Sequence, residues 1–187
     1  MVASVLLVAL AEIGDKTMLL AIVLAARFRR PVPIIAGIFA ATMANHALAA
    51  WAGAGIAGLL DGFWFRLGVA LGFVAMAAWA LIPDEIDGKE AKRPARFGPF
   101  LTTTLAFFAA EMGDKTQIAT VALGARYHAV ALVAAGTTIG MMIANVPAVY
   151  LGDRIQRIVP MKAVRIGAAA IFAAIGFWAL ADLARAG

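Results

Sequence analysis

The chain has 187 residues, of which 64% are hydrophobic and 14% charged, and it contains no cysteine. Soluble domains are about 45–50% apolar and about 25% charged, so this composition, with a mean hydropathy of +0.91, excludes a soluble protein and predicts an integral membrane protein. The lack of cysteine also excludes disulfides and thiolate chemistry.

Six segments are long and apolar enough to cross about 30 Å of hydrocarbon, for which roughly 20 residues are needed. They cover about 3–26, 33–60, 63–82, 99–125, 128–151 and 164–184. We therefore expect an all-α membrane protein with six transmembrane helices and no separate soluble domain.

The first segment, 3–26, holds the charged string Glu12-Ile-Gly-Asp-Lys-Thr17 in its middle. The residues before this string lack the positively charged leader of a signal peptide, so we expect them to begin the first membrane helix. A charged group at the centre of a membrane helix costs from about 2.5 to more than 10 kcal/mol. Such a cost predicts a functional role, and an ion pathway is the default one.

The second segment carries Asn45 and His46, and the third ends at a hydrophilic linker. Asn45 is interpreted either as a helix–helix hydrogen-bond group or as an outer ion ligand, and the same two interpretations apply to Asn145. The linker at 83–98 mixes both charge signs with proline and glycine, which predicts a solvated cytoplasmic connector. A metal-sensing or regulatory role for its acidic residues stays open.

The second half of the chain repeats the first at an offset of 99 residues. Positions 110–127 match 11–28 at 9 of 18 places, and 164–180 match 65–81 at 8 of 17. The fourth segment thereby holds a second charged string, Glu111-Met-Gly-Asp-Lys-Thr116. Because each repeat has three spans, an odd number, the second must enter the membrane from the opposite side. The sequence predicts two inverted three-helix repeats, 1–82 and 99–187, an architecture common in secondary transporters.

Basic residues favour one side of the membrane. If the segments alternate, one side holds eleven Lys and Arg residues and the other holds three, Arg66, Arg126 and Arg185. The positive-inside rule places the basic loops in the cytoplasm and both termini outside, as in a bacterial-type inner membrane. The net charge of +5 then reflects topology, and we expect a lipid bilayer and no nucleic acid as partner.

The charged residues of each string are predicted to cluster, because positions i, i+3 and i+4 share one helix face. The clusters comprise Glu12, Asp15, Lys16, Glu111, Asp114 and Lys115. If all are ionised and the two clusters meet, two negative charges remain, which one divalent cation or two protons would neutralise. Gly14 and Gly113 allow either close helix approach or local unwinding that exposes backbone carbonyls.

The predicted metal ligands are oxygen donors, with two lysines that tune their charge and two asparagines in a possible second layer. They are Glu12, Asp15, Thr17, Glu111, Asp114, Thr116 and Gln117, then Lys16 and Lys115, then Asn45 and Asn145. Such donors suit Ca²⁺, Mn²⁺ and Mg²⁺. Zinc or copper would favour Cys or His, and His46 is the only histidine well inside a span. We expect a transported divalent cation and no resident cofactor.

The two strings, in a six-span chain with a charged central loop, resemble the family catalogued as uncharacterised protein family 0016. It includes Golgi, chloroplast and bacterial members associated with Mn²⁺ and Ca²⁺ transport in exchange for protons. Its signature, Glu-x-Gly-Asp-Lys-[Ser/Thr], is matched at Glu12–Thr17 and Glu111–Thr116. A polar or aromatic residue often follows in the family, and here Gln117 and Met18 differ, so the half-sites are not equivalent. The resemblance implies cation export from the cytoplasm, with manganese favoured over calcium.

Three other interpretations stay open. The lysines could engage a carboxylate in an exporter of an amino acid or similar metabolite, although the excess of negative groups argues against it. Each lysine could instead neutralise its own helix neighbours, as a salt-bridge clip in a non-transporting assembly factor. Asp15 and Asp114 could form an intramembrane aspartyl protease dyad, but the surplus of charge is unlike a dyad. We therefore expect a transporter, not an enzyme, and the sequence is compatible with a homo-oligomer.

Overall fold

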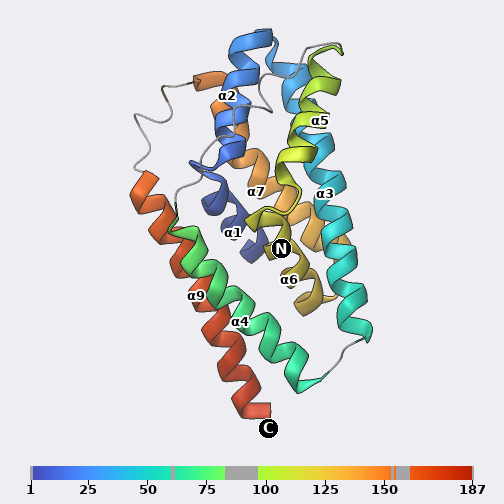
Figure 1. Ribbon diagram of the computed structural model, residues 1–187, viewed down its shortest axis with the longest axis vertical. Coiled ribbons are helices and arrows are strands. Elements are labelled where there is room, and N and C mark those ends of the chain that lie inside the picture. The colour runs from blue at the N-terminus through green and yellow to red at the C-terminus, as the bar shows by residue number, and fades with distance from the viewer. Residues whose placement is uncertain (1, 60–61, 83–96, 153, 155–160, 187) are drawn as a thin grey trace.

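The computed structural model describes residues 2–59, 62–82, 97–152, 154 and 161–186, and helices make up nearly all of this part of the chain (Figure 1). No strand occurs among the described residues. In chain order the helices are α1 (Val2–Glu12), α2 (Lys16–Phe28), α3 (Pro31–Leu59), α4 (Phe63–Ala80), α5 (Pro99–Glu111), α6 (Lys115–Tyr127), α7 (Val130–Leu151) and α9 (Met161–Ala186).

Four of these helices, α3, α4, α7 and α9, are each long and apolar enough to cross a membrane. They correspond to the segments expected at 33–60, 63–82, 128–151 and 164–184. The protein is therefore an integral membrane protein whose described part is helical. Of the expected linker, residues 83–96 lie outside the described residues, so the interpretations of that linker stay predictions.

The segments expected as single helices at 3–26 and 99–125 each consist of two helices, which corrects the prediction. The first segment breaks between Glu12 and Lys16, and the second between Glu111 and Lys115. Hydrophobic periodicity did not reveal the breaks, because apolar residues continue on both sides of each charged string. The break also means that a shared helix face is not what brings the charges of one string together.

Two of the remaining helices, α1 and α5, pack in a reciprocal pattern. Helix α1 packs against α7, and α5, its counterpart in the repeat, packs against α3. A Cβ atom added at Gly140 of α7 would lie 2.6 Å from Val5 O, and one at Gly37 of α3 would lie 2.7 Å from Phe100 O. Both crossings therefore bring backbone against backbone, the close packing that small residues permit between membrane helices.

Two apolar clusters lie on either side of the helix breaks. One takes residues from α1 and α6, including Leu7 and Leu123, and from α3, α4, α7 and α9. The other takes residues from α2 and α5, including Leu20 and Phe107, together with α3 and α7. The charged strings are consequently enclosed between two apolar layers.

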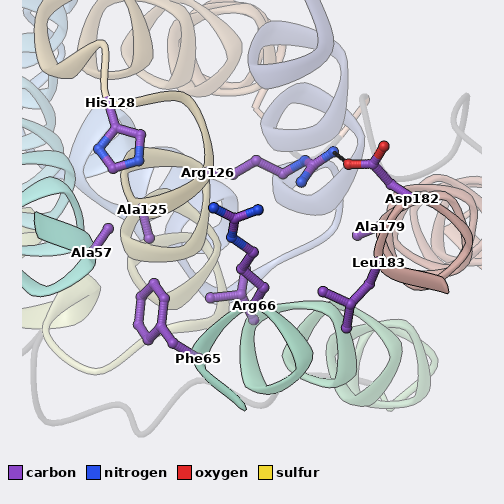
Figure 2. Close-up of a pocket in the computed structure, with 10 residues that line it drawn as sticks. Ala57, Phe65, Arg66, Ala125, Arg126, His128, Ala179, Asp182 and Leu183 are labelled. Atoms are coloured by element: carbon purple, nitrogen blue, oxygen red, sulfur yellow. Dashed lines mark hydrogen bonds and ion pairs between the residues drawn. The ribbon is translucent and has the colours of Figure 1, made fainter. Parts of the chain in front are cut away.

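Helices α4 and α9 form a pair beside the other helices (Figure 1), and repeat-equivalent Phe73 and Phe172 meet in it with ring centroids 6.4 Å apart. Near one end of this pair lies a cavity of about 240 Å³, into which Arg66 and Arg126 project (Figure 2). Arg126 Nη2 lies 3.3 Å from Asp182 Oδ2, which ties α6 to α9.

Candidate cation site

The two helix breaks have the same backbone geometry. Gly14 and Gly113 have φ angles of 86° and 77°, a region that costs other residues about 1–2 kcal/mol. The following aspartates, Asp15 and Asp114, are extended, with ψ of 169° and 165°, and each is the N-cap residue of the next helix. Of the two roles foreseen for the glycines, local unwinding is the one observed at both breaks. A Cβ at Gly113 would meet no atom within 4 Å, so its φ angle and not its size requires glycine.

The side chain four residues after each glycine holds the unwound backbone. The N–H of Gly113 donates to Gln117 Oε1 at 2.7 Å, and the N–H of Gly14 donates to Met18 Sδ at 3.5 Å. Gln117 was expected to be a metal ligand, but its amide oxygen is engaged by this N–H. Met18, which the sequence analysis left out of the site, has the equivalent role in the first repeat.

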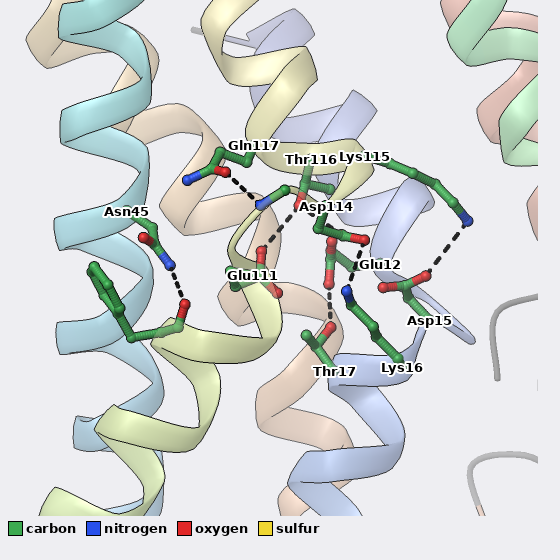
Figure 3. A network of polar contacts seen from close by, with 12 residues as sticks. Glu12, Asp15, Lys16, Thr17, Asn45, Glu111, Asp114, Lys115, Thr116 and Gln117 are labelled. Atoms are coloured by element: carbon green, nitrogen blue, oxygen red, sulfur yellow. Dashed lines mark hydrogen bonds and ion pairs between the residues drawn. The ribbon is translucent and has the colours of Figure 1, made fainter. Parts of the chain in front are cut away.

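Three carboxylates converge from the two strings. Glu12, Asp15 and Asp114 are buried, and each offers an oxygen within 4.8 Å of the others (Figure 3). The two aspartates begin α2 and α6, whose N-terminal dipole ends favour negative charge. Neither aspartate caps its own helix with its side chain. The carboxylates therefore face the other string and are not committed to local backbone.

Threonine hydroxyls join the glutamates to this group. Thr17 Oγ1 donates to Glu12 Oε2 at 2.5 Å. Thr116 Oγ1 lies 3.1 Å from Glu111 Oε2 and 3.3 Å from Asp114 Oδ2, so its single proton can serve one oxygen at a time. Glu111, which is fully buried, is thus linked to Asp114 through Thr116.

The lysines pair across the two strings. Lys16 Nζ lies 3.2 Å from Asp114 Oδ1, and Lys115 Nζ lies 3.7 Å from Asp15 Oδ1 (Figure 3). The idea that each lysine neutralises only its own helix neighbours is therefore wrong, because these two ion pairs connect opposite repeats. The two lysines are unequally enclosed, since 27% of the Lys16 side chain is exposed against 8% for Lys115.

Two buried carboxylate oxygens, Glu12 Oε1 and Glu111 Oε1, have no hydrogen-bond partner among the described residues. A buried polar atom without a partner costs about 1–3 kcal/mol, and a charged one costs more. The four carboxylates of the two strings, those of Glu12, Asp15, Glu111 and Asp114, outnumber the two lysines by two charges if all are ionised. The cluster therefore calls for a bound cation or for protons.

The two asparagines donate hydrogen bonds to helix backbone in different ways. Asn45 Nδ2 donates to Phe108 O at 3.2 Å, which ties α3 to the last turn of α5. Asn145 Nδ2 donates to Met141 O at 3.0 Å within α7. Both Oδ1 atoms are buried without a hydrogen-bond partner in the described part of the chain. The amides thus have helix hydrogen bonds and still leave an oxygen available.

Comparison with known proteins agrees with this chemistry. The family "Divalent cation/proton antiporter GDT1" matches residues 1–88 and 99–186. A relative from Vibrio cholerae serotype O1 (strain ATCC 39541 / Classical Ogawa 395 / O395), described as "Putative manganese exporter", is 50% identical over 170 residues, which cover 90% of this chain and 84% of the relative. No solved structure matches. Two charged strings that converge within a helical membrane protein, together with a match over nearly the whole length, show that the chain belongs to the GDT1 family of divalent cation/proton antiporters.

Proposed function

We propose that this transporter exchanges Mn²⁺, with Ca²⁺ as the alternative cation, for protons at a site near the membrane midplane. The site is formed by Glu12, Asp15, Glu111 and Asp114. The observation that carries the proposal is the convergence of carboxylate oxygens from both strings, within 4.8 Å of one another for three of these residues.

Six membrane crossings in two inverted repeats are the architecture that best accommodates the broken helices. Neither α1 nor α2 can cross the membrane alone, because 11 residues of α1 extend only about 16 Å at about 1.5 Å per residue. Half of a hydrocarbon core is about 15 Å, so a crossing made of α1 and α2 would have its break near the midplane. The same holds for α5 and α6. The repeats 1–82 and 99–187 would then be joined by a cytoplasmic linker at 83–98.

The ligand chemistry supports a hard divalent cation. Carboxylate oxygens are the donors that Mn²⁺ and Ca²⁺ prefer. The hydroxyls of Thr17 and Thr116 are hydrogen-bonded to the carboxylates of Glu12 and Glu111 and add further oxygen donors. The manganese named for the Vibrio cholerae relative favours Mn²⁺ over Ca²⁺. Gln117 supports the second break through its hydrogen bond with Gly113. Asn45 and Asn145 would form an outer layer around the cation ligands.

Proton exchange follows from charge balance. With all six charged groups ionised, the site carries two negative charges, which a divalent cation neutralises and two protons neutralise equally well. A site that must be close to neutral inside the membrane therefore holds the cation and the protons alternately. Lys16 and Lys115, each paired with the aspartate of the other string, would keep the two strings together while the ion is absent.

The direction of transport rests on topology. Eleven basic residues on the side of the central linker place that side in the cytoplasm by the positive-inside rule, with both termini outside. In a bacterial-type inner membrane, inward movement of protons would then drive the cation outward.

Cation flux into proteoliposomes tests the proposal. Mn²⁺ and Ca²⁺ are tested separately, with and without a pH gradient, for the parent chain, Glu12→Gln, Glu111→Gln and the linker variant Glu90→Gln as a control with the same charge change. We expect flux that responds to the pH gradient and falls at least about tenfold in both site variants, since each 1.4 kcal/mol of lost binding is tenfold. Equal flux in all four proteins would favour a structural role for the strings, and no flux of either cation would favour a metabolite exporter.

A further inference from the structure

Trp79 and Trp178 are equivalent residues of the two repeats, yet they contact different cations. Lys115 Nζ lies 5.9 Å from the centre of the Trp79 ring. The guanidinium of Arg126 lies 4.5 Å from the centre of the Trp178 ring. Under the 99-residue offset, the counterpart of Lys115 is Lys16, so equal conformations would place Lys16 at Trp178. The two halves of the protein therefore differ at these tryptophans.

The packing of the α4 and α9 pair differs between the halves in the same sense. Helix α9 packs against α1, and α4 packs against α6. In the other half, the equivalent contacts would be α4 against α5 and α9 against α2. The pair makes its principal contacts with α1 and α6 instead. The pair thus lies to one side of helices α1 and α5, which pack reciprocally on α7 and α3 (Figure 1).

Two cavities of unequal size reflect the asymmetric position of the α4 and α9 pair. Three pairs of equivalent residues line them: Arg66 and Arg165, Val69 and Ala168, and Ala179 and Ala80. The first member of each pair lines the cavity of about 240 Å³, which Arg126 shares (Figure 2). The second member lines a space of about 10 Å³ that also touches Asp15 and Lys115. The α4 and α9 pair therefore lies close to Asp15 and Lys115 and leaves a larger cavity near Arg126 at the end of α6.

We propose that Trp79 and Trp178 are positioning residues that exchange cationic partners during transport, an inference that rests on the proposed cation exchange. In the observed state, Trp79 covers the motif lysine Lys115 and Trp178 holds Arg126. In the alternate state, the α4 and α9 pair packs on α5 and α2, so that Trp178 covers Lys16 and Trp79 holds Arg27. Each tryptophan thus alternates between a motif lysine and an arginine at a helix end.

The consequence for the site is a change in which lysine is enclosed. Lys115, under Trp79, is held against Asp15 with 8% of its side chain exposed. Lys16, without such a cover, has 27% exposed. Arg27 is the partner proposed for Trp79 in the alternate state. In the observed state its guanidinium lies 5.4 Å from the centre of the Phe28 ring. The exchange would open the string at Lys115 and close the string at Lys16, giving the cation access from one side at a time.

Thiol labelling tests this exchange directly, because the chain contains no cysteine. Ala80→Cys and Ala179→Cys are matched reporters, one in the small space and one in the large cavity. Each is labelled in nanodiscs with a small charged thiol reagent that reaches both faces, in the parent background and with Arg126→Gln or Arg27→Gln. Arg126→Gln removes the contact with Trp178 that belongs to the observed state. Arg27→Gln removes the contact with Trp79 proposed for the alternate state, together with the present contact of Arg27 with Phe28.

We expect Ala179→Cys to react faster than Ala80→Cys in the parent background. Arg126→Gln should raise labelling of Ala80→Cys and lower that of Ala179→Cys by at least about threefold each, as a population shift requires. Arg27→Gln should keep or strengthen the parent pattern. If Arg126→Gln does not fold, Asp182→Asn breaks the same tie from α9.

Parallel changes at both cysteines, or the same effect from Arg27→Gln and Arg126→Gln, would overturn the exchange. The labelling requires no transport, so it separates this inference from the proposed function. Flux that depends on Glu12 and Glu111 without reciprocal labelling would refute the exchange alone. Reciprocal labelling without any cation flux would support the exchange of partners and refute the Mn²⁺ or Ca²⁺ substrate.

Discussion

Individual side chains in the site are held by contacts between the two strings and by hydroxyl groups within them. Lys16 reaches Asp114 and Lys115 reaches Asp15, so each ion pair also fixes the distance between the repeats. Removing one partner of a buried pair leaves an uncompensated charge and is strongly destabilising, although the desolvation of both charges offsets much of the stability that the intact pair contributes. The threonines are the residues whose contribution can be measured without changing the charge.

Thr17→Val is expected to weaken cation transport. The hydroxyl donates to Glu12 Oε2 at 2.5 Å, and hydrogen bonds to charged groups contribute about 1.5–3 kcal/mol. Valine preserves the shape of threonine, so we expect about a tenfold fall in flux at a cation concentration below saturation.

Thr120→Val is the matched control, because its hydroxyl donates to Thr116 O one turn earlier on the same helix. Initial rates in proteoliposomes over a range of Mn²⁺ concentrations make the comparison. A loss of the same size in both variants would mean that the Thr17 hydroxyl has no special role.

At the scale of elements, the decisive feature is that each of the two apolar segments with a charged string is divided into two short half-helices. Each division places a glutamate at the end of one half and an aspartate at the N-cap of the next. The non-helical backbone at such a break is tolerated in a membrane only where protein or a polar site surrounds it. The breaks therefore create the site as well as interrupting the helices.

Gly113→Ala is expected to disturb the second break through backbone strain. Its φ of 77° costs an alanine about 1–2 kcal/mol, while the added Cβ would meet no atom within 4 Å. We expect a lower unfolding temperature in detergent and reduced cation flux, because Asp114 follows directly.

The control is Gly68→Ala on α4, which likewise has open space but lies inside a helix. There alanine should be neutral or should stabilise by up to about 1 kcal/mol. Unchanged stability and flux in Gly113→Ala would show that the break adapts without glycine.

At the scale of the whole molecule, close backbone crossings hold the half-helices against the long helices. A Cβ at Gly53 of α3 would overlap the carbonyl of Val121 on α6, and one at Gly124 of α6 would lie 2.9 Å from Ala50 Cα. The position of α6, and with it the second string, is therefore set by how closely α3 approaches.

Gly53→Ala is expected to push α3 and α6 apart and to destabilise the protein by about 1–3 kcal/mol, the usual cost of overpacking. Gly55→Ala, two residues further on the same helix, adds a Cβ with no atom within 4 Å and should be nearly neutral. Thermal unfolding of both variants in the same detergent gives the comparison, and equal melting temperatures would contradict the close crossing.

Much of the protein follows from sequence because local chemistry was sufficient. Composition predicted a helical membrane protein, and the offset of 99 residues located the second Glu-x-Gly-Asp-Lys-Thr string. The four long helices lie where the apolar segments predicted them. These features depend on hydrophobicity and on residue identity along the chain, both of which can be read directly.

Tertiary structure alone decided how the charged side chains pair and where the two halves of the protein differ. That Lys16 meets Asp114, and not only its own string, depends on how two helices 99 residues apart are brought together. The contact of Lys115 with Trp79, and of Arg126 with Trp178, depends on where the α4 and α9 pair lies. The two repeats match closely in sequence at α4 and α9, so residue identity does not decide where this pair lies, and packing between segments far apart in the chain does.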